Sequence, residues 1–207
     1  MKLTNRWNLL IYRLWSPVYD LVFTRLFASG RQRALQLLDL KQGERVLIVG
    51  VGTGADLPLL PRGVSAIGVD LSRDMLARAN AKLPLVERDV LLICGDAQTL
   101  PVRAQTFDAV LLNLILSVVP DAAQCWRQSV TAAKANGRVV IFDKFAPEHD
   151  DQSGRRRILN LITMLAGTDI TRKFSAMVAG TRATIVHDEP NIFHGTYRVM
   201  RVHLPTD

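Results

Sequence analysis

The sequence predicts an α/β fold built on one mostly parallel sheet of seven strands with helices on both faces and an antiparallel C-terminal hairpin. Three observations lead to this prediction. Apolar runs alternate with helical patterns from Arg45 to Phe145, the runs are almost continuously apolar, and the chain ends in two segments that alternate apolar and polar residues. Strands that are buried on both faces have such apolar character, and strand-helix-strand crossovers make neighbouring strands parallel.

Five apolar runs account for the parallel part of the sheet. Ser72 is the predicted N-cap of a helix after the second run. Asp121 is the predicted N-cap of a helix after the fourth run, which ends near Lys134 at the stop signal "ANG". The predicted strands are "RVLIVG" (45–50), "SAIGVD" (65–70), "VLLICG" (90–95), "FDAVLLNL" (107–114) and "GRVVIFD" (137–143).

The two ends of the chain are expected to add helices and the hairpin. Before the first strand, apolar residues recur every three or four positions, and Ser16 with Pro17 begins a second helix. After the fifth strand, a polar loop and two short amphipathic helical stretches precede alternating segments at 181–189 and 196–204, which form the antiparallel hairpin at the sheet edge.

Size and composition indicate one globular domain in a reducing compartment. The chain has 207 residues, of which 48% are hydrophobic, enough for a substantial core. Cys94 and Cys125 lack metal-binding or redox spacing, so we predict no metal site and a cytoplasmic location. No signal peptide is expected, and the longest nearly uncharged run, which begins at Ala109, is about half of the ~20 residues that a spanning helix needs.

Basic charge is concentrated near the N-terminus. The net charge is +7, and residues 1–33 contain six basic residues and one acidic residue. Such an asymmetry is typical of proteins that meet an anionic partner, either nucleic acid or a membrane surface, although a basic excess also simply keeps proteins in solution.

The stretch "RVLIVGVGTGADL" places three glycines directly after the first predicted strand. "GVGTGA" satisfies the dinucleotide pattern if Ala55 takes the last position, and Asp70 follows Gly50 by 20 residues, at the end of the second strand. A carboxylate there accepts hydrogen bonds from ribose hydroxyls. The motif is typical of a Rossmann-like fold and permits NAD, while a phosphate loop is excluded because no Lys-Ser or Lys-Thr follows the glycines.

Four motifs in order resemble those of the class I S-adenosylmethionine-dependent methyltransferases. They extend from Arg45 to Asp143, and the terminal hairpin is similar to the last two strands of that family's seven-stranded sheet. Asn136 stands where the family usually has glycine, which is a mild departure because Asn tolerates a left-handed backbone. The motifs are "VLIVGVGTGADL", "AIGVDLSRDMLARA", "ICGDAQTLPVRAQTFDAV" and "AKANGRVVIFD".

The resemblance implies S-adenosylmethionine as the cofactor and a role for each matching residue. Gly50, Gly52 and Gly54 would pass beneath its methionine and ribose, and Asp70 would bind the ribose hydroxyls. The alternative interpretation of Asp70, and of Asp96 after the third strand, is that the carboxylate simply caps the end of a strand.

The adenine and the transferable methyl group have implied neighbours as well. Leu71 and Met75 would flank the adenine, while Asp96 and the Ala97 amide would bind its polar edge. Asn113, at the end of the fourth strand, would lie beside the methyl group. The alternatives are ordinary core packing for Leu71 and Met75 and a satisfied buried amide for Asn113.

The N-terminal segment "SPVYDLVFTRLFASGRQRAL" resembles the branch of bacterial phospholipid N-methyltransferases and quinone C-methyltransferases. In that branch a helix forms a lid over the cofactor, which implies a single domain, 1–207, with a helical lid or membrane-contact region (1–40), a cofactor-binding core (41–145), a helical substrate-side insertion (146–180) and the C-terminal hairpin (181–207). Tyr19 would lie near the methionine end of the cofactor or near the substrate, or pack with its hydroxyl at the rim. Tyr19 and His149 are the candidate proton acceptors.

The composition of the N-terminal helix favours a lipid substrate. Residues 3–15 carry tryptophan, tyrosine and leucine with basic flanks, as in helices that lie in the membrane interface, and Arg155, Arg156 and Arg157 would add a second contact. Stripes of this kind also occur in helices that are simply core. We therefore expect a peripheral protein at the inner face of the membrane, with anionic lipid as a partner and nucleic acid not expected.

The leading hypothesis is methyl transfer to the amine of phosphatidylethanolamine or its methylated derivatives. A quinone precursor or another small hydrophobic or thiol acceptor is the first alternative. A non-catalytic cofactor-binding or nucleic-acid-binding protein is the second, and NAD-dependent dehydrogenation is a third.

Overall fold

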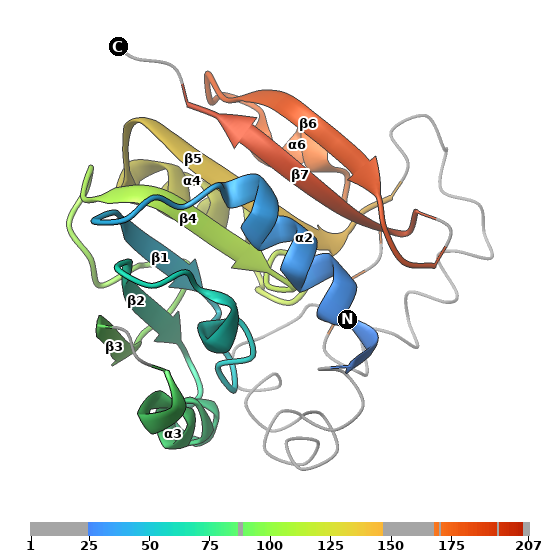
Figure 1. Cartoon of the computed structure of the whole chain (residues 1–207). Coiled ribbons are helices and arrows are strands. Elements are labelled where there is room, and N and C mark those ends of the chain that lie inside the picture. Colours follow the sequence, from blue (N-terminus) through green and yellow to red (C-terminus); the bar gives the residue numbers. More distant parts are fainter. Residues whose placement is uncertain (1–24, 87–88, 147–167, 170, 194, 205–207) are drawn as a thin grey trace.

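A seven-stranded sheet forms the centre of the computed structural model, in the order β3-β2-β1-β4-β5-β7-β6 (Figure 1). The structure describes residues 25–86, 89–146, 168–169, 171–193 and 195–204. The predicted fold class, a mostly parallel sheet with an antiparallel C-terminal hairpin, is confirmed.

The first five strands are parallel, and their order reverses at β1. They are β1 (Arg45–Val49), β2 (Ser65–Asp70), β3 (Asp89–Cys94), β4 (Phe107–Asn113) and β5 (Ala133–Lys144). From β1 the chain moves outward to β2 and β3, then returns to place β4 on the other side of β1. Ligands of open α/β sheets bind at the carboxyl ends of strands on either side of such a reversal.

Helices cover both faces of the sheet, which gives three layers (Figure 1). On one face, α2 (Ala28–Leu38) and α3 (Arg73–Lys82) bury residues such as Leu38 and Ala79 against the sheet. On the other face, α4 (Ala122–Ala132) and α6 (Phe174–Val178) contribute Trp126 and Phe174 to a second cluster. Two short 3₁₀ turns, η1 (Leu57–Leu59) and η2 (Leu83–Leu85), complete the connections.

Both predicted N-caps are confirmed. The Ser72 hydroxyl accepts a hydrogen bond from the Met75 N–H at 3.3 Å, and the Asp121 carboxylate accepts one from the Gln124 N–H at 2.8 Å. Each satisfies one of the backbone donors left open at a helix start. These caps fix where α3 and α4 begin, and therefore where the loops after β2 and β4 must end.

β5 begins earlier than the sequence indicates. The predicted strand starts at Gly137, but Ala133 already pairs with Phe107, and the register then shifts between Phe107 and Ala109. The extra residues fit because Asn136 adopts a left-handed conformation, with φ of 60°, as its place in the glycine turn predicts.

The predicted hairpin consists of β6 (Thr184–Pro190) and β7 (Tyr197–His203). β7 runs antiparallel to β5, with Tyr197 opposite Lys144, so the turn between β6 and β7 lies at the carboxyl edge of the parallel strands. Of the two amphipathic stretches predicted before the hairpin, α6 lies in the described part of the chain.

Candidate functional site

The glycine loop after β1 is bound to the end of β2. The N–H groups of Gly50 and Val51 both donate to the Val69 carbonyl, at 2.8 and 3.0 Å. Gly50, Gly52 and Gly54 all have positive φ values, of 73°, 56° and 75°. Only glycine adopts these angles without a steric cost, so the sequence motif is required by the backbone.

The space around the three glycines differs. A Cβ atom at Gly54 would lie 3.1 Å from the Ala79 Cα of α3, and one at Gly50 would lie 2.6 Å from the Ile115 Cδ1. A Cβ atom at Gly52 would meet no atom of the described residues within 4 Å. Side chains at Gly50 and Gly54 would therefore collide with neighbouring residues, whereas the position at Gly52 leaves open space for a ligand.

Asp70 connects the glycine loop to the start of α3. Its carboxylate accepts hydrogen bonds from the Gly52 N–H at 2.8 Å and the Ser72 N–H at 2.9 Å. Burial raises the pKa of the Asp70 carboxyl group, and the N–H donors of Ser72, Gly52 and Leu71 act in the opposite direction. The residue that the sequence assigns to ribose binding therefore also holds the loop.

The loop after β3 lies next to Asp70. The Gly95 N–H donates to the Asp70 carbonyl at 3.0 Å, which places Asp96 beside the second strand's end. Asp96 accepts from the Gln98 N–H at 2.8 Å and from the Gln98 side-chain amide at 3.0 Å. Ala97 is buried, as is Met75 of α3, while Leu71 is half-buried.

Asn113 reaches the far side of the glycine loop. It is buried at the last position of β4, and its side-chain N–H donates to the Asp56 Oδ1 at 2.9 Å. The other Asp56 oxygen forms an ion pair of 2.8 Å with Arg31 of α2. The predicted cofactor residues, from Gly50 to Asn113, thus all lie at the carboxyl edge of the sheet, around the reversal at β1.

Sequence reasoning missed Asp56 and Arg31. Asp56 is only 1% exposed, which is unusual for a carboxylate, and lies within "GADLPLL", where its position in an apolar stretch is the available signal. Arg31 is one of several arginines near the N-terminus and carries no sequence pattern of its own.

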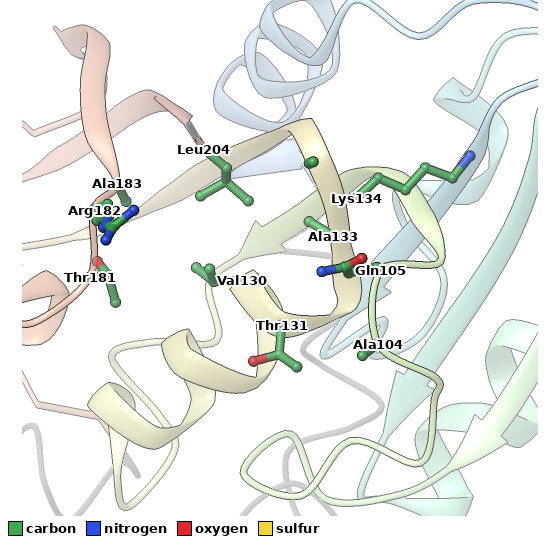
Figure 2. A pocket seen from close by; sticks show the side chains of 11 residues that line it. Ala104, Gln105, Val130, Thr131, Ala133, Lys134, Thr181, Arg182, Ala183 and Leu204 are labelled. Atoms are coloured by element: carbon green, nitrogen blue, oxygen red, sulfur yellow. The ribbon is translucent and has the colours of Figure 1, made fainter. Parts of the chain in front are cut away.

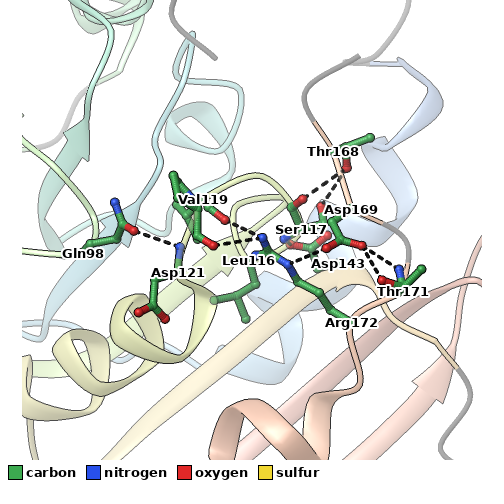
Figure 3. Close-up of polar contacts among 11 residues, drawn as sticks. Gln98, Leu116, Ser117, Val119, Asp121, Asp143, Thr168, Asp169, Thr171 and Arg172 are labelled. Carbon is green, nitrogen blue, oxygen red and sulfur yellow. Dashed lines mark hydrogen bonds and ion pairs between the residues drawn. The ribbon is translucent and has the colours of Figure 1, made fainter. Parts of the chain in front are cut away.

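A second polar group, shown in Figure 3, supports the loop after β4. Asp143 of β5 is fully buried and accepts from the N–H groups of Ser117 and Lys144, at 3.0 and 2.8 Å. Burial raises the pKa of the Asp143 carboxyl group, and the hydrogen bond with Ser117 lowers it. The Thr168 hydroxyl, from the segment before α6, lies 3.4 Å from the Ser117 hydroxyl.

Arg172 attaches that same segment to the β4 loop (Figure 3). Its guanidinium donates to the carbonyl of Leu116, to that of Val119 at 2.7 Å and to that of Pro120 at 3.3 Å. It also pairs with Asp169 at 3.4 Å. Two segments about 50 residues apart in sequence are thereby held together at the carboxyl edge of β4 and β5.

Several predicted residues lie outside the described part of the chain. These include both candidate proton acceptors, Tyr19 and His149, and the basic residues 155–157. Their roles stay predictions. Among the described residues, no three His, Cys, Asp or Glu side chains are grouped so that they could hold a metal ion. No helix that the described residues form has the length and apolar character to cross a bilayer.

Two pockets lined by described residues lie away from this site. One, of about 370 Å³, lies between the end of α4 and the beginning of β5 and includes Lys134, Arg182 and Leu204 (Figure 2). The other includes Arg45 and Asp89, at the starts of β1 and β3. Both are at the amino-terminal edge of the parallel strands, opposite the glycine loop.

Comparison with known proteins agrees with the motif assignment. Residues 47–141 match the methyltransferase domain family. The chain is 30% identical to a phosphatidylethanolamine N-methyltransferase of Cereibacter sphaeroides over 192 residues, which is 92% of this chain and 94% of that protein.

Other relatives share the core. A demethylmenaquinone methyltransferase of Shouchella clausii is 30% identical over 142 residues, 66% of this chain and 60% of that protein. The structure of a geranyl diphosphate methyltransferase in complex with S-adenosylmethionine superposes with a TM-score of 0.71, at 14% identity, and the match covers 86% of each chain.

The residues present fit this cofactor. The open position at Gly52, the carboxylate of Asp70 and the polar loop at Asp96 are arranged along one edge, as a nucleoside with an amino-acid tail requires. The sheet order and the matches across the chain point the same way. The chain belongs to the S-adenosylmethionine-dependent methyltransferases, and S-adenosylmethionine is its cofactor.

Proposed function

We propose that this methyltransferase N-methylates phosphatidylethanolamine and its methylated derivatives at the inner surface of the membrane. The observation that carries the proposal is the end-to-end match with the Cereibacter sphaeroides enzyme, 92% of this chain against 94% of that protein. The match with the demethylmenaquinone methyltransferase covers only 60% of that protein. A larger share of the quinone enzyme than of the phospholipid enzyme therefore has no counterpart in this match.

The chemistry of the site is compatible with an amine acceptor. Bound S-adenosylmethionine supplies a methyl group on a positively charged sulfur, so the protein needs chiefly to align the acceptor with that group. Gly52 and Asp70 would hold the ribose, and Asp96 with Ala97 would hold the adenine. Asn113 is the last residue of β4. The loop that follows it would face the acceptor. Tyr19 and His149 remain candidates for taking the amine's proton.

Charge and composition support contact with a lipid surface. The net charge of +7 and the basic, aromatic residues 3–15 are suited to an interface that contains anionic lipid. A small soluble thiol acceptor would not require such a surface, whereas a hydrophobic quinone precursor would share it with the phospholipid. A non-catalytic role would leave both the amine and the quinone unmethylated.

The test combines lipid and soluble acceptors. Purified protein is incubated with methyl-labelled cofactor and one of three acceptor preparations. These are phosphatidylethanolamine in vesicles that contain an anionic lipid, phosphatidylethanolamine in vesicles of zwitterionic lipid only, and a demethylated quinone in detergent. We expect label in the mono-, di- and trimethylated lipids, most with anionic vesicles and less as salt screens the surface charge. Label in the quinone alone would favour the alternative, and label in neither acceptor would contradict methylation of both classes.

A further inference from the structure

The inference starts from an unsatisfied oxygen on Asn113. The residue is 4% exposed, and no described residue donates a hydrogen bond to its side-chain Oδ1. Buried amide oxygens normally have a partner, and each exception calls for an explanation. At the end of β4 in this fold, a ligand is one such explanation.

The direction of the Asn113 amide is fixed by its neighbours. Its N–H group donates to Asp56 at 2.9 Å, and Arg31 holds the other oxygen of that carboxylate at 2.8 Å. Turning the amide over would place its oxygen against the carboxylate, which repels it. The Asp56–Arg31 pair therefore leaves the Asn113 oxygen as the free end of the amide.

The amide lies beside the glycine loop. Asp56 follows Gly54 by two residues, and Ile115, two residues after Asn113, packs so closely on Gly50 that a Cβ there would be 2.6 Å from its Cδ1. The free oxygen is therefore in the part of the carboxyl edge where the loop after β4 approaches the cofactor loop.

We propose that the Asn113 Oδ1 accepts a hydrogen bond from the N–H group of the acceptor amine, with Asp56 and Arg31 as positioning residues. This rests on the proposed function. A neutral amine forms the new N–C bond with its lone pair as the C–S bond breaks and its electron pair passes to sulfur; the resulting ammonium then releases a proton. The acceptor must therefore arrive unprotonated.

An amide suits this task better than a carboxylate. A carboxylate beside the nitrogen would favour its protonated form, in which the lone pair is no longer available. The negative charge of Asp56 is instead paired with Arg31, and the network presents an uncharged oxygen at its other end. That oxygen can orient the nitrogen without holding it as an ammonium ion.

The proposal distinguishes the three methylation steps. The neutral amine of phosphatidylethanolamine has two N–H bonds, the monomethyl derivative has one, and the dimethyl derivative has none. The Asn113 oxygen can therefore assist the first two transfers but not the third.

The test compares Asn113→Leu with the wild-type chain on all three acceptors, presented separately in otherwise identical anionic vesicles. We expect kcat/KM to fall about tenfold for the unmethylated and monomethyl lipids, as for loss of one hydrogen bond, and by less than about twofold for the dimethyl lipid. An equal fall on all three acceptors, or no fall on any, would overturn the proposal. Asn113→Ala, which also removes the acceptor oxygen and should show the same pattern across the three lipids, serves if the leucine variant does not fold.

Two measurements separate this result from other causes. Calorimetric titration with S-adenosylhomocysteine should give unchanged affinity in Asn113→Leu; a clear loss would assign the oxygen to the cofactor's ammonium group instead and overturn the proposal. Ser129→Ala, which removes a buried hydrogen bond of 2.8 Å within α4, controls for general destabilisation and should methylate all three lipids as wild type does. If the wild-type chain methylates no lipid, the proposed function itself fails.

Discussion

At the scale of single residues, Asp70 has two tasks that a substitution can separate. It accepts from the Gly52 and Ser72 N–H groups, and its position implies binding of the cofactor ribose. An asparagine keeps the size but replaces one acceptor oxygen with a donor. That change affects both the loop and any ribose hydroxyl that donates to it.

We expect Asp70→Asn to weaken S-adenosylhomocysteine binding about tenfold or more, since hydrogen bonds to charged groups contribute about 1.5–3 kcal/mol. Calorimetric titration measures the affinity directly. Asp74→Asn, on the exposed side of the first turn of α3, removes the same charge nearby and should bind as wild type does. Equal affinities for all three proteins would show that Asp70 has only the structural task.

The residues that sequence could predict are those whose spacing is local to a motif. Gly52 and Asp70 are separated by one crossover, and the structure joins them by a hydrogen bond of 2.8 Å. Asp56 and Arg31 form an ion pair between the glycine loop and a helix 25 residues earlier, and no periodic pattern connects them. Their pairing depends on how α2 docks, which is a tertiary property.

At the scale of elements, caps and glycine turns were predictable because each depends on a few adjacent residues. Ser72 and Asp121 are examples. The early start of β5 was not, because Ala133 joins the sheet through a register shift opposite Phe107 that only the pairing of two strands determines. The starts of α3 and α4 follow from local caps, whereas the start of β5 follows from its pairing with β4.

Helix α2 packs on the sheet through a glycine. A Cβ atom at Gly30 would lie 2.2 Å from the Phe142 ring of β5. Replacing a helical glycine by alanine usually stabilises a helix by up to about 1 kcal/mol. Here the opposite sign is expected, since the Phe142 ring is fully buried and occupies the place of the added methyl group.

We expect Gly30→Ala to lower the free energy of unfolding by about 1–3 kcal/mol, the usual cost of overpacking. Urea denaturation provides the measurement. Ser29→Ala, at an exposed position of the same helix, should change stability by less than about 0.5 kcal/mol. Combining Gly30→Ala with Phe142→Leu should recover part of the loss, and a stabilised Gly30→Ala variant would refute the packing argument.

At the scale of the whole molecule, α2 also contacts β6, the edge strand at one end of the sheet. Arg33 makes two hydrogen bonds to Glu189 of β6, at 2.6 and 3.0 Å, across 156 residues of sequence. The hydrogen bond from Arg33 is the main cause that lowers the pKa of Glu189 from 4.5 to about 2. Because the folded pKa is the lower one, the stability from this pair is present above pH 4.5 and disappears as the pH falls toward 2.

Arg33→Gln should therefore lose less stability than wild type between pH 6 and pH 3, since its Glu189 pKa lies closer to that of the unfolded chain. Urea unfolding at the two pH values gives the comparison. Arg103→Gln removes the same charge from an exposed position in the loop before β4, and should keep the wild-type pH dependence. Identical pH dependence in Arg33→Gln and wild type would exclude the Arg33–Glu189 pair as its source.

Arg172 has a consequence for how such enzymes diverge. It holds the loop after β4 by main-chain oxygens, those of Leu116, Val119 and Pro120, which every amino acid supplies. Substitutions in that loop can therefore accumulate without releasing it from the segment before α6. Side chains in this loop can therefore be exchanged to suit a new acceptor while Arg172 still holds the loop's main chain in place.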